Sequence, residues 1–313
     1  MKKLLLSFVV ALFTVGAINA QDLETVTNLY NAAAEVLSSG DDAAALTQFE
    51  AALKSATALG DEGAAIANNC KDVIPKLLVS IGKSCANSGK IDEAIDNFNK
   101  AIDVAAEYGN DAVLAEASAL IPQMLMANAG QLLNDKKYLE AAAAYKKVVD
   151  LDPTNGTAWL RMGMAYAAEG NSNQLAIEAL NAAAENGQEA NAKKQLATVY
   201  LKEAVACQKA KDMAGMLENA QLSAQNNDSA NAQKLIGTAA LNLKQNKVAA
   251  DAFEAYLALN PNASDKAQTI YQLATALMGA GDNAKACSYF KQIANDEKWG
   301  EAARYYITTL KCN

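Results

Sequence analysis

The chain has 313 residues, of which 51% are hydrophobic and 20% charged, enough apolar material for a sizeable core. Its formal net charge is −8 and no cluster of lysine or arginine is interleaved with aromatic residues, so we expect no nucleic-acid partner. The sequence contains no histidine, which removes the usual nucleophilic triads and the commonest ligand of zinc, copper and iron. We therefore expect no enzymatic activity, no metal and no cofactor.

The first twenty residues have the pattern of a secretory signal peptide. Lys2 and Lys3 precede an apolar run over residues 4–17, and Ala20 supplies a small residue for cleavage. The run has 14 residues, fewer than the roughly 20 that a membrane-spanning helix needs. We predict cleavage after Ala20 and no transmembrane segment afterwards. The expected location is the periplasm, with outer-membrane association or secretion as alternatives.

The rest of the chain repeats a two-helix pattern seven times. In the first helix of each unit, a small residue lies on the apolar face: Ala33, Gly82, Ala129, Gly163, Ala204, Gly237 and Ala274. In the second helix, a recurring position is alanine in all units except the fifth: Ala45, Ala94, Ala141, Ala176, Met216, Ala249 and Ala286. Helical spacing and small residues at fixed positions indicate helices that pack closely in a regular series.

The fourth unit has the clearest pattern. Trp159, Met162, Gly163 and Tyr166 fall at i, i+3, i+4 and i+7 and share one helix face. A glycine there costs about 1 kcal/mol in helix propensity relative to alanine, so another backbone is expected to come very close. With the second-helix pair of an alanine and a leucine four residues later, this stretch resembles the tetratricopeptide repeat. The resemblance implies an all-α fold, an α-solenoid of about seven helix pairs.

Residues 298–311 are expected to form a further amphipathic helix that caps the exposed end of the series. Upstream, 49 residues separate Ala45 from Ala94, against a repeat of about 34, so the early helices should be lengthened. They should also be kinked or interrupted at Pro75 and Pro122. The fifth unit departs most from the pattern and is interpreted as a flexible joint, or as simple drift within a regular solenoid. We place the division into domains there, with the first four repeats in 21–187 and the others in 188–313.

Five cysteines follow the predicted cleavage site, and an exported chain meets an oxidising compartment. Cys287 and Cys312 are the best candidate disulfide pair, because the last helix should pack back onto the helix that carries Cys287. Alternatively, each cysteine is a small buried apolar residue. That alternative is favoured for Cys85 and Cys207, which occupy the tyrosine position of their repeats.

Two sequences resemble ligand-binding loops without completing them. Residues 82–84 read Gly-Lys-Ser, but a phosphate-binding loop needs a glycine where Leu77 stands. Residues 150–156 resemble part of a calcium loop, but Pro153 interrupts them and the third acid is missing. Acidic pairs such as Asp41 and Asp42 lie where second helices begin, and we interpret them as helix caps.

In tetratricopeptide-repeat proteins the first helices line a concave face. The positions just after the tryptophan and glycine positions should therefore face a groove. The central ones are apolar, and the candidate partner-binding residues are Met126, Leu160, Arg161, Met164, Leu201, Val205 and Tyr271. They suit an amphipathic helix or extended segment of another protein. Alternatively, they belong to the core between repeats or contact the capping helix.

Among the positions just after the tryptophan and glycine positions of all seven repeats, only Lys83 and Lys234 are basic, and they lie far apart in the chain. This argues against a carboxylate clamp for a peptide C-terminus. The expected function is that of an exported scaffold that binds another envelope or exported protein, as in envelope assembly. The alternative is a self-assembling structural component of the cell envelope, which would associate through the ends of the array or through the fifth unit.

Overall fold

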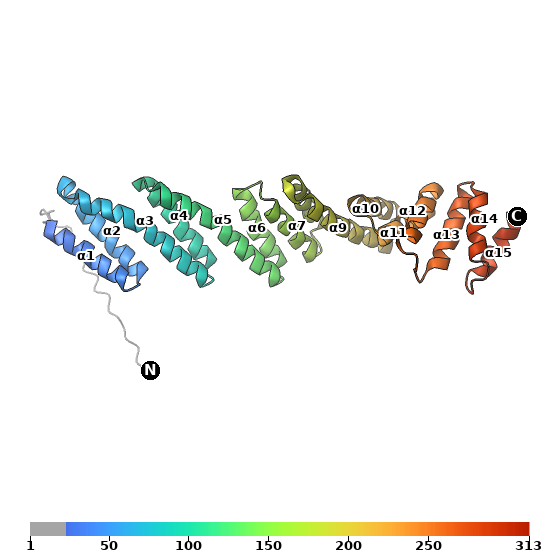
Figure 1. Ribbon diagram of the computed structural model, residues 1–313, viewed down its shortest axis with the longest axis horizontal. Helices are drawn as coiled ribbons and strands as arrows, with labels where there is room; N and C mark the ends of the chain where they lie inside the picture. The colour runs from blue at the N-terminus through green and yellow to red at the C-terminus, as the bar shows by residue number, and fades with distance from the viewer. Residues whose placement is uncertain (1–22, 313) are drawn as a thin grey trace, which may run out of the picture. The chain divides into compact units, whose positions relative to one another are not determined.

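The computed structural model describes residues 23–312, so the predicted signal peptide lies outside the described residues. Within that range the protein has fifteen α-helices and no β-strand (Figure 1). The helices are α1 Leu23–Ser38, α2 Asp42–Ala58, α3 Ala64–Asn87, α4 Ile91–Tyr108, α5 Asp111–Asn134, α6 Tyr138–Leu151, α7 Gly156–Glu169, α8 Asn173–Ala183, α9 Glu189–Ala210, α10 Met213–Asn226, α11 Ala230–Asn242, α12 Asn246–Leu259, α13 Lys266–Gly279, α14 Asn283–Gln292 and α15 Gly300–Thr309. Their order confirms the all-α solenoid, with seven successive helix pairs followed by one more helix.

The chain forms two compact units, the first ending at Met124 and the second beginning at Leu125. Helix α5 runs through this division. The domain boundary predicted between residues 187 and 188 stays a prediction. At that place the helical chain is interrupted between α8 and α9, where Asn186 and Gly187 have non-helical backbone angles. Gly187 has a φ of 83°, in the left-handed region that glycine adopts without penalty.

In the first unit, α1 packs on α2, α2 on α3 and α3 on α4. The glycine position explains the α3–α4 contact: a Cβ atom on Gly82 would lie 2.5 Å from a ring carbon of Phe98. Helix α3 has 24 residues and continues through Pro75, and α5 likewise continues through Pro122. The lengthened helices are therefore confirmed, and neither is interrupted at its proline.

In the second unit, each helix from α6 to α14 packs on the next one along the chain, and α14 packs on the last helix, α15. A Cβ atom on Gly163 would lie 2.7 Å from Cγ of Leu180 and 3.2 Å from the carbonyl oxygen of Ala176. Gly237 meets the Phe253 ring in the same way, at 2.7 Å. The side chain of the second helix, rather than its backbone, is thus the closest neighbour of these glycines.

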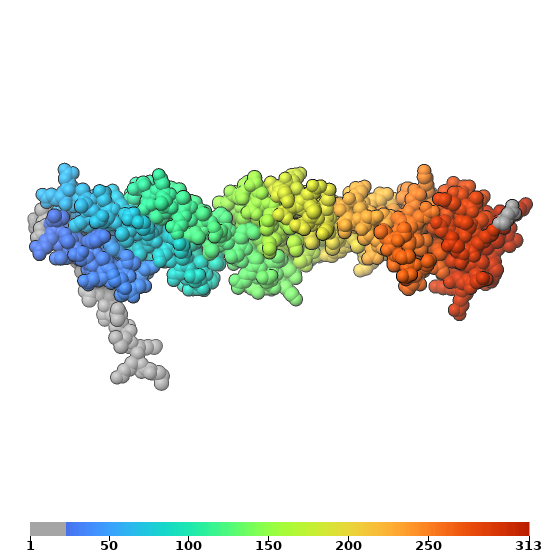
Figure 2. Space-filling view, in the orientation of Figure 1, coloured from blue at the N-terminus to red at the C-terminus, as the bar shows by residue number. Residues whose placement is uncertain are grey.

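The recurring position of the second helix is fully buried in all seven pairs, including the fifth, where it is Met216. Helix α15 covers the end of the series: Tyr306 stacks on Phe290 of α14 with ring centroids 5.0 Å apart. Figure 2 shows the α13–α15 region, in orange and red, as one densely packed body. The predicted capping helix therefore buries apolar surface that the seventh pair would otherwise expose.

Helix α5 is the one helix between residues 23 and 312 that is long and apolar enough to cross a membrane. Its mean hydropathy reaches 1.2 over 18 residues. The same helix buries one residue in every four along a single face: Val113, Ala117, Ile121, Leu125 and Ala129. This spacing is that of a helix that packs one narrow stripe against its neighbours, and 28% of the 18-residue window is buried.

Candidate functional site

The candidate groove residues lie on first helices and differ in their surroundings. Met126, Met164, Leu201 and Val205 are half-buried, whereas Arg161 is exposed. Leu160 is half-buried and packs against a cluster of buried residues from α8 and α9: Ala176, Leu180, Leu196 and Val199. Leu160 thus takes part in packing between successive helix pairs.

Tyr271 of α13 is held in the aromatic cluster at the C-terminal end. Its ring centroid lies 4.8 Å from that of Trp299 and 5.9 Å from that of Phe290. Burial raises the pKa of the Tyr271 phenol, and the neighbouring Tyr306 adds to the effect. Tyr271 therefore contacts the capping region of its own chain, as in the alternative interpretation.

The remaining apolar positions lie on helices that contact one another. Helix α7 packs on α9, and α9 packs on α11. Met164 on α7 and Val205 on α9 both follow the glycine position of their repeats, Leu201 follows the tryptophan position of the fifth repeat, and each of the three is partly exposed. We refer to these three residues as the apolar row.

Lys83 and Lys234, the two lysines at positions just after the tryptophan or glycine position, each form an ion pair with an acidic residue of the same chain. In the first unit, Nζ of Lys83 lies 2.6 Å from Oε1 of Glu116. In the second unit, Lys234 of α11 forms an ion pair with Asp265. Neither lysine has its charge free for the terminal carboxylate of a peptide, which adds to the argument against a carboxylate clamp.

Asp265 is the centre of a polar cluster at the start of α13. The Tyr256 hydroxyl of α12 donates a hydrogen bond of 2.6 Å to Oδ1, and Lys234 donates to Oδ2. Burial by itself raises the pKa of the Asp265 carboxyl, but these hydrogen bonds and the lysine charge outweigh it, and the net pKa is lowered. The carboxylate is thus held in its charged form by partners within the fold.

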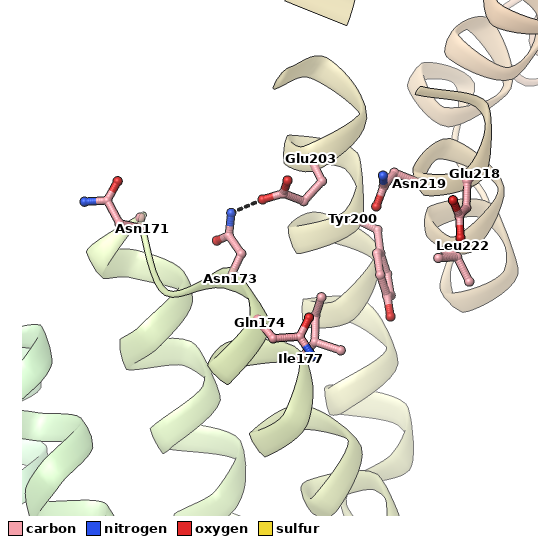
Figure 3. Close-up of a pocket in the computed structure, with 10 residues that line it drawn as sticks. Asn171, Asn173, Gln174, Ile177, Tyr200, Glu203, Glu218, Asn219 and Leu222 are labelled. Carbon is pink, nitrogen blue, oxygen red and sulfur yellow. Dashed lines mark hydrogen bonds between the residues drawn. The ribbon is translucent and has the colours of Figure 1, made fainter. Parts of the chain in front are cut away.

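A second polar cluster borders an open hollow of about 680 Å³ between α8, α9 and α10 (Figure 3). The amide side chains around it belong to Asn171, Asn173, Gln174 and Asn219, and the carboxylates to Glu203 and Glu218. Tyr200, Ile177 and Leu222 add an aromatic ring and two apolar walls. We refer to this site as the polar hollow.

The two sides of the polar hollow meet at one hydrogen bond. Asn173, the first residue of α8, donates through Nδ2 to the Glu203 carboxylate of α9, as the dashed line in Figure 3 marks. The Asn173 Oδ1 atom is buried and has no hydrogen-bond partner within residues 23–312. Glu203 therefore meets a neutral donor, and its charge is not balanced there by a cation.

The position of Glu203 in the repeat could have revealed this site. It falls three residues after Tyr200 and directly before the small residue Ala204. The equivalent position holds Met162 in the fourth repeat and Leu273 in the seventh, both buried. A carboxylate at a position that other repeats use for packing indicates a polar site at this place in the fold.

Other side chains resolve the remaining sequence hypotheses. The structure joins Cys287 of α14 to Cys312, just after α15, by a disulfide bond. Burial raises the pKa of the Cys70 thiol to about 11, which keeps it protonated and unreactive. Asp152 accepts hydrogen bonds from the backbone N–H and the hydroxyl of Thr154, as expected of a turn. Within residues 23–312 no group of three or more acidic, cysteine or histidine side chains could hold a metal ion.

These features define a class of protein, an all-helical repeat protein of the α-solenoid type. Residues 75–108 and 268–297 each match a family model of the tetratricopeptide repeat. The chain therefore contains tetratricopeptide repeats. Proteins of this class present extended surfaces to other proteins and are typically not enzymes, so protein–protein interaction is the kind of function that the family indicates.

Solved structures similar to this chain include two proteins with repeats of the same kind. A crystal structure of MamA protein is 21% identical and covers 58% of this chain and 94% of its own, with a TM-score of 0.38. A crystal structure of YrrB, described as a TPR protein with an unusual peptide-binding site, is 19% identical. It covers 58% of this chain and 91% of its own, with a TM-score of 0.36. Comparison with curated proteins gives no match.

Proposed function

We propose that the protein is an exported scaffold that binds a helix or extended segment of another protein along the apolar row. The observation that carries this proposal is the partial exposure of Met164, Leu201 and Val205 at predicted groove positions of two contacting helices, α7 and α9. A short apolar strip of this kind suits one face of an amphipathic segment. Methionine adds a flexible contact that adapts to different partner side chains.

Two neighbouring residues extend the proposed contact. Met126 on α5 follows the tryptophan position of its repeat, as Leu201 does, and is also half-buried, and Arg161 is exposed on α7. Leu160 and Tyr271 are left out because they pack against other parts of the same chain. The engaged lysines, Lys83 and Lys234, favour recognition of side chains rather than of a terminal carboxylate.

The test of the apolar row is a crosslinking pulldown from native envelopes with purified mature protein as bait. Met164→Glu and Leu201→Glu should each abolish capture of the proteins that the parent captures, because a buried unpaired charge opposes apolar contact. The matched control is Leu259→Glu on the second helix α12, where the leucine is 50% exposed, and it should capture normally. Circular dichroism checks that helicity is kept. Capture that survives both row substitutions contradicts the proposal.

Export is a separate part of the proposal. The positive residues, apolar run and small residue of the first twenty positions support it, and the Cys287–Cys312 bond suits an oxidising compartment. The expected result is a mature protein that begins at Gln21 and fractionates with the periplasm. Intact mass and N-terminal sequencing of protein from its own cells measure this. An uncleaved chain found in the cytoplasm contradicts it.

A self-assembling envelope component is the second candidate. The observation that favours it is a set of large apolar side chains left exposed on second helices, Leu139, Leu151, Leu175 and Leu259. Exposed apolar residues of this size are suited to contacts between copies. Molar mass measured by light scattering across a concentration series distinguishes the candidates, since a strict monomer excludes self-assembly.

A further inference from the structure

We propose that the polar hollow between α8, α9 and α10 is a second binding site, which takes the side chain of an arginine from a protein partner. The site is separate from the apolar row, because it is lined by second helices and by Tyr200 and Glu203 of α9 rather than by Met164, Leu201 or Val205. Its chemistry points to a cation that also donates several hydrogen bonds.

The charge of the hollow is the first argument. Glu203 and Glu218 both line it and none of its lining residues is basic, although Nζ of Lys202 lies 3.5 Å from where a Cβ atom on the lining residue Gly170 would stand. Glu203 accepts a hydrogen bond from the neutral Asn173 side chain and Glu218 is exposed, so neither negative charge is offset by a cation of the lining. A guanidinium group would balance this charge and bind a carboxylate through two parallel hydrogen bonds.

The amide side chains supply the second argument, because two of them that line the hollow have their nitrogens engaged within the fold. Asn219 donates its Nδ2 to the carbonyl oxygen of Gly215 at 2.9 Å, and Gln174 donates its Nε2 to Glu178 at 3.0 Å. Both partners accept only, so the nitrogen of each amide must be the atom that faces them. The amide oxygens are left to accept from a ligand. A guanidinium has five N–H donors, enough for a carboxylate and both oxygens.

The apolar part of the hollow fits the rest of an arginine side chain. Ile177 and Leu222 can cover its methylene groups, and Tyr200 offers an aromatic face on which a guanidinium stacks. A lysine would balance the charge, but its ammonium group cannot form the two parallel hydrogen bonds of a planar guanidinium. An acidic ligand would be repelled. The chain's net charge of −8 adds a general attraction for basic segments.

The experiment titrates the full mature chain with three capped tripeptides, acetyl-Gly-Arg-Gly-amide and the same peptide with lysine or glutamine in the middle. Binding is followed by NMR through the side-chain amide signals of Asn173 and Asn219. The arginine peptide should bind saturably and the glutamine peptide should not bind. The lysine peptide should bind at least about fivefold more weakly than the arginine peptide, because it lacks the fork.

Isosteric variants connect this binding to the two carboxylates. Glu203→Gln and Glu218→Gln should each weaken the arginine peptide by about tenfold, the effect of losing one hydrogen bond to a charged group. The matched control is Glu185→Gln, an exposed carboxylate just beyond α8 that does not line the hollow, and it should bind like the parent. If Glu203→Gln is misfolded by circular dichroism, Glu218→Gln carries the test, because Glu218 is exposed.

Three results would overturn the proposal. They are absence of saturable binding by the arginine peptide, unchanged affinity in the Glu203→Gln/Glu218→Gln double variant, and equal affinity for the arginine and lysine peptides. Met164→Glu keeps the hollow intact and should bind the arginine peptide like the parent. Failure of the apolar row and failure of the hollow are therefore distinguished by different variants.

Discussion

The fifth and sixth helix pairs, α9–α10 and α11–α12, each have a carboxylate at a junction with a neighbouring element, and the two carboxylates have different partners. Asp265 receives hydrogen bonds from a lysine and a tyrosine of the sixth pair, so its charge is balanced within the fold. Glu203 of the fifth pair receives one from the neutral Asn173 and borders the polar hollow. A carboxylate with a cationic partner stabilises the protein, whereas one without such a partner is available to a ligand.

The apolar packing beneath these clusters is complete in both pairs. In the sixth pair, Gly237 gives room to the Phe253 ring. In the fifth pair the sizes are exchanged: Met216 stands where alanine is usual and Ala220 where an aromatic is usual, and both are fully buried. The polar hollow is therefore not a consequence of a defective core.

The largest expected effect comes from removing the Phe253 ring. Phe253→Ala should lower the free energy of unfolding by about 3–5 kcal/mol, because it leaves a cavity beside Gly237 that the rigid helices do not fill. Urea unfolding followed by circular dichroism measures this. A loss below about 1 kcal/mol would mean that the sixth pair packs no better than a loosely filled core.

Asp265→Asn should lower the free energy of unfolding by about 1–3 kcal/mol at neutral pH, since it weakens two hydrogen bonds to a charged group. The folded pKa of Asp265 lies below its unfolded value of about 3.9. This contribution is therefore present above pH 4 and is lost as the pH falls through the folded pKa. Unfolding curves from pH 7 to pH 2 should show the parent and the variant converging at acid pH. A constant difference across that range contradicts the proposed charge balance.

Gly237→Ala should destabilise by about 1–2 kcal/mol, although alanine is the better helix former, because the new Cβ atom would lie 2.7 Å from the Phe253 ring. The reverse change in the fifth pair, Ala204→Gly, should also destabilise, by about 1 kcal/mol through helix propensity and by a further amount through the loss of a fully buried methyl group. Thermal unfolding of both variants gives the comparison. A more stable Gly237→Ala variant would show that the ring can move aside.

The smallest effect is expected at the polar hollow. Glu203→Gln should change the free energy of unfolding by no more than about 0.5 kcal/mol, because glutamine still accepts the hydrogen bond from Asn173 and no cationic partner is lost. The same urea experiment measures it beside Asp265→Asn. A loss as large as that of Asp265→Asn would place Glu203 among the stabilising carboxylates and remove the contrast between the two pairs.

The repeat pattern predicted the fold because each helix pair is defined by local spacing. The small residue of the first helix and the alanine of the second were enough to predict close packing within each pair, but the closest neighbours of Gly82 and Gly237 are the Phe98 and Phe253 rings rather than the expected backbone. The helices themselves were located by the same positions. What the pattern did not predict was continuity through Pro75, because a proline inside a long, well-packed helix is tolerated there.

The candidate site was less accessible to sequence reasoning. Leu160 packs against residues of α8 and α9, and Tyr271 packs against Trp299. These contacts join residues of different helices, so local spacing in the sequence does not predict them. The polar hollow depends on the meeting of Asn173 with Glu203, which are 30 positions apart. No local spacing joins these two residues, although a carboxylate at a packing position was visible in the sequence.

The Cys287–Cys312 bond has a consequence for how the series of helices comes apart. In a one-dimensional stack the terminal element has a neighbour on one side only, so it frays first and its opening limits the stability of the next element. The bond closes a loop of chain across α14 and α15, with a sequence separation of 25. When α15 detaches, it stays tethered at high effective concentration beside the surface that it left. In hydrogen exchange, α15 should therefore behave like an interior helix under oxidising conditions and like a fraying end after reduction.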